Sequence, residues 1–324
     1  MKATINKPSP RIIFMGTPEF AVATLKKLVD KGISIVAVIT APDKPAGRGM
    51  HLQQSPVKKY ALEKGLTVLQ PEKLKAPEFL DSLRSFHADL QIVVAFRMLP
   101  EAVWNMPPMG TINLHASLLP QYRGAAPINW AIINGEKETG LTTFKLRQEI
   151  DTGNILLTVR IPIGETESAG ELHDRMKDFG AELIVKTLAG LAENTLQEQS
   201  QSSHSVTETE SSLKKAPKIF TETCLINWER PINEVNDLIR GLSPYPGAFT
   251  YLKDKMLKIF KATAIRGLQS SILPGNFETD RQTFLRFACT NGYIDVMELQ
   301  LEGKKKMPVQ DFLRGYNFEK NNAP

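Results

Sequence analysis

Cysteine is scarce in this chain of 324 residues: only Cys224 and Cys289 occur, and they have no CxxC spacing. This scarcity argues against a disulfide framework and a zinc cluster, and it favours a reducing compartment, the cytoplasm. No apolar run approaches the roughly 18 residues that a membrane-spanning helix needs. The first ten residues, MKATINKPSP, lack the apolar core of a secretory signal. We therefore expect a cytoplasmic protein without a membrane segment.

Common nucleotide-binding and metal-binding motifs are also missing. The turn after the first predicted strand (residues 11–15) reads GTPEF rather than G-x-G-x-x-G. A lone glycine does not give a pyrophosphate the close backbone approach that it needs, so a nicotinamide dehydrogenase is disfavoured. The sequence contains no HExxH motif, no paired Cys/His cluster and no P-loop. Neither a metal nor ATP is therefore expected.

The apolar periodicity of the first part predicts an α/β fold. A strand, a helix and a second strand are predicted at residues 11–15, 20–30 and 33–39, which indicates a βαβ unit and a parallel sheet. Residues 90–96 (LQIVVAF) show no clear alternation, as is typical of a strand covered on both faces. We expect a Rossmann-like, mostly parallel sheet.

A linker and a second domain are predicted beyond this sheet. Residues 197–212, QEQSQSSHSVTETESS, contain almost nothing to bury. They would separate a first domain (1–196) from a second (213–324). Short apolar segments between Gly, Pro and Asn turns, together with one helix at 231–242, predict a small β-barrel of the OB type in the second domain.

The net charge of +5 resides entirely in the second domain. Residues 213–324 contain 17 Lys and Arg against 12 Asp and Glu, whereas residues 1–212 contain 23 of each sign. This distribution indicates that the second domain contacts an anionic partner, and a basic OB barrel favours nucleic acid. The alternative is a basic surface that only keeps the protein in solution.

Three polar residues at predicted strand ends could carry chemistry: Asn113, His115 and Asp151. Sites in open α/β sheets form at the carboxyl ends of strands, so the three could converge. An Asn amide can stabilise a developing oxyanion, a histidine can move a proton, and a neighbouring carboxylate can stabilise the imidazolium. The set suits acyl or formyl transfer without a covalent adduct. The alternatives are a structural histidine, an aspartate that only forms a turn, and an asparagine bonded to a neighbouring loop.

Residues 41–51, APDKPAGRGMH, are predicted to form an exposed, partly mobile loop with two basic side chains, Lys44 and Arg48. The loop is either a surface segment with incidental charge or a flexible clamp on phosphate or sugar.

Several motifs together resemble the tetrahydrofolate-dependent formyltransferases, and most closely those that act on methionyl-tRNA. They are RIIFMGTPEF at the start, APDKPAGRG, the pattern Asn-x-His followed by SLLPQYRGAAPINWAI, the DTG turn 36 positions after His115, and SPYPGAF at 243–249. The resemblance covers nearly the whole chain in the same order. It implies 10-formyltetrahydrofolate as donor, the α-amino group of initiator Met-tRNA as acceptor, and no metal.

The resemblance also implies roles for individual residues. Asn113 would hold the formyl oxygen, His115 would polarise it or handle the proton, and Asp151 would orient His115 and help to remove the amine proton. Ser117, Leu118, Leu119 and Pro120 match the folate-binding segment. Arg48, with Lys44 in the same loop, matches the part that grips the acceptor arm of the tRNA, and this loop would be disordered without tRNA. We expect a monomer.

Two departures from the family pattern and two rival functions remain. Arg97 stands where a glycine is common, so it would either alter the pterin pocket or point to solvent. Glu149 likewise replaces a glycine before Asp151.

The first rival is a folate-dependent formyltransferase that acts on a small amine, such as a nucleotide sugar or glycinamide ribonucleotide. The second rival is a non-enzymatic RNA-binding protein.

Overall fold

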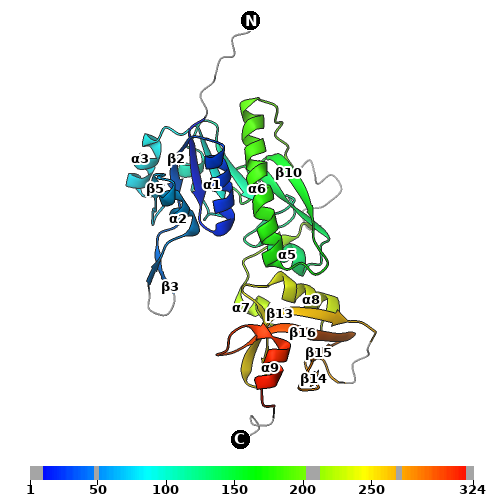
Figure 1. Ribbon diagram of the computed structural model, residues 1–324. Helices are drawn as coiled ribbons and strands as arrows, with labels where there is room; N and C mark the ends of the chain where they lie inside the picture. The colour runs from blue at the N-terminus through cyan, green and yellow to red at the C-terminus, as the bar shows by residue number, and fades with distance from the viewer. Residues whose placement is uncertain (1–9, 47–50, 202–211, 268–271, 319–324) are drawn as a thin grey trace. The chain divides into compact units, whose positions relative to one another are not determined.

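The computed structural model describes residues 10–46, 51–201, 212–267 and 272–318, and the chain divides into two compact units (Figure 1). The first unit comprises Met1–Arg123, Gly140–Ile161 and His173–Lys214. The second comprises Gly124–Thr139, Pro162–Leu172 and Lys215–Pro324. Two segments that precede residue 173 thus join the C-terminal part. The expected domain bounds stay a prediction, because most of the expected linker lies outside the described residues.

A seven-stranded sheet forms the centre of the first unit. Its strands are β1 (Ile12–Gly16), β2 (Ile35–Ile39), β5 (Val68–Leu69), β6 (Leu90–Val94), β7 (Thr111–His115), β9 (Glu138–Lys145) and β10 (Ile155–Pro162). They lie in the order β10-β9-β7-β6-β1-β2-β5. The pairs from β7 through β5 are parallel, whereas β9 runs antiparallel to β7. The predicted Rossmann-like, mostly parallel sheet is confirmed.

Helices cover both faces of this sheet. They are α1 (Glu19–Asp30), α2 (Pro56–Glu63), α3 (Pro77–Ser85), α4 (Glu101–Trp104) and α6 (Ala169–Ala192). On one face, Ile13 of β1 packs in a cluster with Leu83 of α3 and Val103 of α4. On the other face, Gly180 of α6 lies so close to β7 that a Cβ atom there would be 2.7 Å from Leu114 Cδ2. Two covered faces explain why every residue of β6 is buried.

Two short paired strands lie where the sequence predicted only a loop. β3 (Lys44–Ala46) pairs antiparallel with β4 (His51–Gln53), and this strand pair extends away from the sheet in Figure 1. Asp43 holds its base, since its carboxylate accepts hydrogen bonds from Lys58 Nζ at 2.6 Å and Gln70 Nε2 at 2.8 Å. The prediction was wrong here because each strand has only three residues and β3 contains a proline, which weakens any strand signal.

The second unit is an antiparallel half-barrel with helices. Its strands are β12 (Ala248–Leu252), β13 (Lys255–Ile265), β14 (Phe277–Thr279), β15 (Leu285–Cys289), β16 (Gly292–Leu301) and β17 (Met307–Pro308). They follow the path β12-β13-β16-β15-β14, and β17 also pairs with β16. The helices are α5 (Pro127–Ile133), α7 (Thr221–Cys224), α8 (Ile232–Gly241) and α9 (Val309–Gly315). The predicted small barrel domain is confirmed in this form. A short pair, β8 (Arg123–Gly124) and β11 (Lys215–Ala216), completes the structure.

The core of the half-barrel contains aromatic and sulfur side chains. Trp228 stacks on Phe287 with ring centroids 4.7 Å apart, and its Nε1 donates to Thr250 Oγ1 at 2.9 Å. Cys224 and Cys289 are both buried and free. Burial raises the pKa of both thiols, that of Cys289 to about 12. Both thiols are therefore chemically quiet in the folded protein.

Within the described part of the chain, every helix is either too short or too polar to cross a lipid bilayer.

Candidate active site

Strand β7 carries Asn113 and His115 on one face. In the register of the sheet, Asn113 lies beside Val93 of β6 and Phe144 of β9. Val93 packs into the cluster beneath α3 and α4, so Asn113 and His115 share that face. His115 is the last residue of β7 and therefore lies at the carboxyl edge of the sheet, where open α/β sheets bind ligands. Asn113 is half-buried, and no other residue in the described ranges hydrogen-bonds its side-chain amide.

A backbone carbonyl fixes the tautomer of His115. His115 is 6% exposed, and its Nε2 lies 2.9 Å from the carbonyl oxygen of Tyr122. A carbonyl oxygen can only accept, so Nε2 must carry the hydrogen. In the neutral ring Nδ1 then has a free lone pair, and this atom faces Asp151 Oδ2 at 3.8 Å. Tyr122 thus sets the tautomer of the neutral imidazole.

Asp151 approaches His115 from the loop between β9 and β10. The argument from carboxyl ends of parallel strands does not explain this approach, because β9 is antiparallel to β7. Instead the loop turns back, with Asp151 in the left-handed region at a φ of 55°. Gly153 presses against the end of β9, where a Cβ atom would lie 1.6 Å from the carbonyl oxygen of Lys145. The glycine of the DTG turn is therefore required by a close backbone contact.

Three residues around this edge have unusual backbone conformations. Ala95 directly after β6, Tyr122 and Asp151 have φ values of 47°, 59° and 55°. The left-handed conformation costs a residue with a Cβ about 1–2 kcal/mol. Such strain gathers at functional sites, where the surrounding contacts hold it in place.

The segment Ser117–Pro120 follows β7 and divides into buried and half-buried positions. Ser117 is buried, and its hydroxyl donates to the carbonyl oxygen of Gln121 at 2.7 Å. Leu119 is buried in a cluster with Phe144 and Ile155. These two side chains stabilise the turn itself. Leu118 and Pro120 are only half-buried.

Arg97 fastens the chain after β6 to a neighbouring loop. Its guanidinium donates to the carbonyl oxygen of Glu72 at 2.9 Å and to that of Pro71, and it lies 5.6 Å from the centre of the Phe96 ring. The sequence had suggested either a changed pterin pocket or a side chain pointing to solvent. The structure shows a side chain that is exposed yet bonded to backbone carbonyls.

The two predicted tRNA-binding residues have different outcomes. Lys44 lies on β3 and is exposed. Arg48 lies within residues 47–50, outside the described residues. The prediction that this loop is disordered without tRNA concerns the same residues and is likewise outside what the structure describes.

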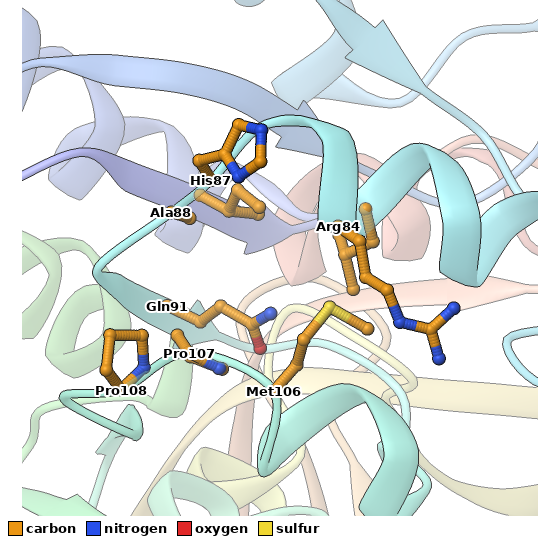
Figure 2. A pocket seen from close by; sticks show the side chains of 9 residues that line it. Arg84, His87, Ala88, Gln91, Met106, Pro107 and Pro108 are labelled. Atoms are coloured by element: carbon orange, nitrogen blue, oxygen red, sulfur yellow. The ribbon is translucent and has the colours of Figure 1, made fainter.

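A cavity of about 220 Å³ lies away from these residues (Figure 2). Ile13 and Gln91 line it from β1 and β6, together with side chains of α3 and of the segment before β7. Gln91 pairs with Thr111 at the start of β7, whereas His115 ends that strand. The cavity thus belongs to the amino-terminal edge of the sheet, opposite to the candidate site.

Sequence reasoning missed two residues at the site. Tyr122 acts through its backbone carbonyl, which no side-chain pattern reveals. Gln201 lies in the segment that was predicted to be a linker, yet it is buried and hydrogen-bonded to the loop of Asp151. A lone buried glutamine in a polar stretch has no sequence signal. Among the described residues there is no cluster of three or more His, Cys, Asp or Glu side chains suited to a metal.

Comparison with known proteins identifies the family. Residues 10–188 match the formyl transferase model, and residues 218–317 match the model of the formyl transferase C-terminal domain. The methionyl-tRNA formyltransferase of Bacteroides fragilis is 51% identical over 319 residues, which are 97% of each chain. That of Flavobacterium johnsoniae is 48% identical over 316 residues, covering 95% of this chain and 96% of its own.

Solved structures share the fold. WlaRD, a sugar 3N-formyl transferase, superposes with a TM-score of 0.65 at 19% identity, covering 92% of this chain and 100% of its own. HypX from Aquifex aeolicus in complex with tetrahydrofolic acid gives a TM-score of 0.64 at 17% identity, covering 94% of this chain and 48% of its own. From the family models and the close, full-length relatives, the chain belongs to the formyl transferase family.

Proposed function

We propose that this chain transfers the formyl group of 10-formyltetrahydrofolate to the α-amino group of methionine on initiator Met-tRNA, for translation initiation. Close relatives that carry the name methionyl-tRNA formyltransferase support this function over nearly the full length of the chain. The observation on which the chemistry rests is the approach of His115 Nδ1 to Asp151 Oδ2, next to an Asn113 amide that no described residue engages.

The donor is a substrate that supplies an activated formyl carbon. During transfer the amine nitrogen forms a bond to this carbon, and the bond from the carbon to N10 of the folate breaks. Negative charge develops on the formyl oxygen, and the attacking amine becomes acidic. The protein must therefore stabilise an oxyanion and accept a proton.

Asn113 is suited to the first task. Its Nδ2 group donates hydrogen bonds, and its position on β7 holds it on the same face as His115. A donor aimed at the developing oxyanion typically contributes about 10²–10³ in rate.

His115 is suited to the second task through Nδ1. The Tyr122 carbonyl occupies Nε2, so Nδ1 is the atom that can accept the amine proton. Asp151, 3.8 Å away, would stabilise the imidazolium that results. The same proton can then pass to N10 as the folate leaves.

The folate and the tRNA would bind through different parts. For the folate, we propose the segment Ser117, Leu118, Leu119 and Pro120, acting through its backbone and the half-buried Leu118 and Pro120. A folate-bound neighbour of the same fold supports a folate site in this domain type. For the tRNA, we propose Lys44 of β3 and Arg48, together with the basic part of the chain at residues 213–324. We also propose that the protein acts as a monomer in the cytoplasm.

Formyl transfer to charged initiator tRNA tests this function. We expect the unaltered protein to formylate Met-tRNA with 10-formyltetrahydrofolate, and Asn113→Ala to lower kcat about 10²–10³-fold. His115→Ala and Asp151→Ala are expected to lower kcat by at least about 10²-fold, since they remove the proton acceptor and its counter-charge. Turnover by His115→Ala at the unaltered rate would refute the assigned mechanism.

A folate-dependent formyltransferase that acts on a small amine is the rival function. The full-length relatives named for methionyl-tRNA and the excess of basic residues in 213–324 disfavour it. Transfer to a nucleotide sugar or glycinamide ribonucleotide, with none to Met-tRNA, would support the rival.

A further inference from the structure

The segment Glu198–Gln201 is attached to the loop that carries Asp151. Gln199 pairs with Ile155 at the start of β10 through two backbone hydrogen bonds of 2.8 and 2.9 Å. Glu198 accepts a hydrogen bond from Asn154 Nδ2 at 2.9 Å and forms an ion pair with Lys145 at 2.5 Å. The first residues of the expected linker are therefore an ordered part of the first unit.

Gln201 makes the most specific contact of this segment. Its Nε2 donates to the carbonyl oxygens of Asp151 and Gly153, each at 2.8 Å. Its Oε1 accepts from Arg123 Nε at 3.1 Å and Nη2 at 2.6 Å. Carbonyl oxygens only accept and a guanidinium only donates, so the amide can lie in only one orientation. With 4% exposure, the side chain is buried and fully hydrogen-bonded.

These contacts connect both halves of the candidate catalytic pair. Arg123 directly follows Tyr122, whose carbonyl holds His115. The Gln201 amide bridges from Arg123 to the backbone of Asp151, which adopts the strained left-handed conformation. A strained residue keeps its conformation only when neighbouring contacts hold it. Gln201 supplies two such contacts at the two carbonyls that flank Thr152.

We propose that Gln201 is a positioning residue for formyl transfer: it holds the Asp151 loop so that the carboxylate faces His115 Nδ1. The inference rests on the proposed function. Gln201 does not contact the reacting atoms in this role, and it acts only by placing Asp151.

Steady-state formylation by Gln201→Ala and Gln201→Glu tests the proposal. Gln201→Ala removes both sets of hydrogen bonds, whereas Gln201→Glu keeps the side-chain size and the acceptor for Arg123 but loses the donors to Asp151 and Gly153. We expect both to lower kcat roughly 10–100-fold, because a small misplacement of a catalytic group can cost about 10² in rate. The KM values for Met-tRNA and 10-formyltetrahydrofolate should stay within about twofold. Gln199→Ala is the matched control, since Gln199 is exposed and its two bonds to Ile155 use only the backbone.

A double-mutant cycle separates positioning from a general structural effect. If Gln201 acts through Asp151, adding Gln201→Ala to Asp151→Asn should lower kcat less than about twofold further. The proposal is overturned if Gln201→Glu is folded by circular dichroism and keeps the unaltered kcat, or if the effects of the two substitutions multiply. Absence of transfer by the unaltered protein would instead overturn the proposed function.

Discussion

At the scale of single residues, the candidate site depends on backbone groups as much as on side chains. The carbonyl of Tyr122 decides which nitrogen of His115 is free, and the carbonyls of Asp151 and Gly153 are the acceptors for Gln201. Side-chain patterns indicated Asn113, His115 and Asp151 as candidates for chemistry, because strand alternation and the DTG turn are local signals. They could not predict the tautomer of His115, since this depends on a carbonyl seven residues further along the chain.

Gly153 provides a residue-scale prediction. A Cβ atom at Gly153 would overlap the carbonyl oxygen of Lys145, so Gly153→Ala must move the loop that carries Asp151. We expect a loss of about 1–3 kcal/mol in the free energy of unfolding, as for other overpacked sites. A fall of at least about tenfold in kcat for formylation should accompany it, since the loop carries a catalytic group.

Gly315→Ala is the control for this substitution, because beyond its chain neighbours and the backbone of its own helix no described atom would lie within 4 Å of a Cβ at Gly315. We expect the free energy of unfolding of Gly315→Ala, measured with urea, and its kcat for formylation to be close to those of the unaltered protein. If Gly153→Ala and Gly315→Ala have the same free energy of unfolding and the same kcat, the Asp151 loop tolerates displacement and the prediction is wrong.

At the scale of elements, the long helices and strands follow the sequence closely and the short elements do not. The long helix α6 begins with a capping box, Ser168 and Glu171, a local signal formed by two residues three positions apart. In contrast, β3 and β4 have three residues each and pair only with one another. The segment at 198–201 shows the same limit: its polar composition predicted a linker, although its backbone pairs with β10. The composition of a segment indicates how much apolar surface it can bury. Its backbone pairing depends instead on which strand edge lies next to it in the folded protein.

The capping box of α6 gives a prediction with a defined pH dependence. The Ser168 hydroxyl donates to Glu171 Oε2 at 2.7 Å and accepts from the Glu171 amide at 3.3 Å, while the Ser168 amide donates to the same carboxylate at 2.8 Å. Ser168→Ala should lower the free energy of unfolding by about 1 kcal/mol at neutral pH. Urea unfolding measures this difference.

The hydrogen bonds from the backbone amide and hydroxyl of Ser168 lower the pKa of Glu171. A carboxyl group with a lowered folded pKa stabilises the fold above its unfolded pKa of about 4.3, and this contribution is lost as the pH falls through the folded pKa. The stability difference between Glu171→Gln and the unaltered protein should therefore narrow as the pH is lowered from about 7 toward about 3. The exposed Glu165→Gln is the control, and a gap for Glu171→Gln that stays constant with pH would contradict the assignment.

At the scale of the whole molecule, charge is divided unevenly along the chain. Residues 213–324 carry the net charge of +5, whereas the two earlier segments of the second unit, 124–139 and 162–172, contain one Lys and five Glu. Lys304 and Lys305 are exposed in the turn between β16 and β17. Such side chains are available to phosphate groups of a nucleic acid.

Replacing both lysines tests whether this turn binds tRNA. Lys304→Ala/Lys305→Ala should weaken tRNA binding and make the plot of log K against log salt concentration shallower, by about 0.7–0.9 for each phosphate group that the variant leaves unneutralised. Filter binding or fluorescence titration from low to moderate salt measures the slope. Lys26→Ala/Lys31→Ala removes the same charge from the first unit, and identical slopes for the two double variants would exclude the turn from the tRNA interface.

The scarcity of cysteine has a practical consequence for measuring how this protein unfolds. Both thiols lie in the second unit, one at the end of α7 and one at the end of β15, and both are enclosed by the half-barrel core. A thiol reagent therefore finds its targets only when that unit unfolds locally or globally, and the chain has no cysteine elsewhere to confuse the signal. The rate of thiol labelling therefore reports the opening of the half-barrel alone. It can be measured with or without tRNA and without an engineered probe.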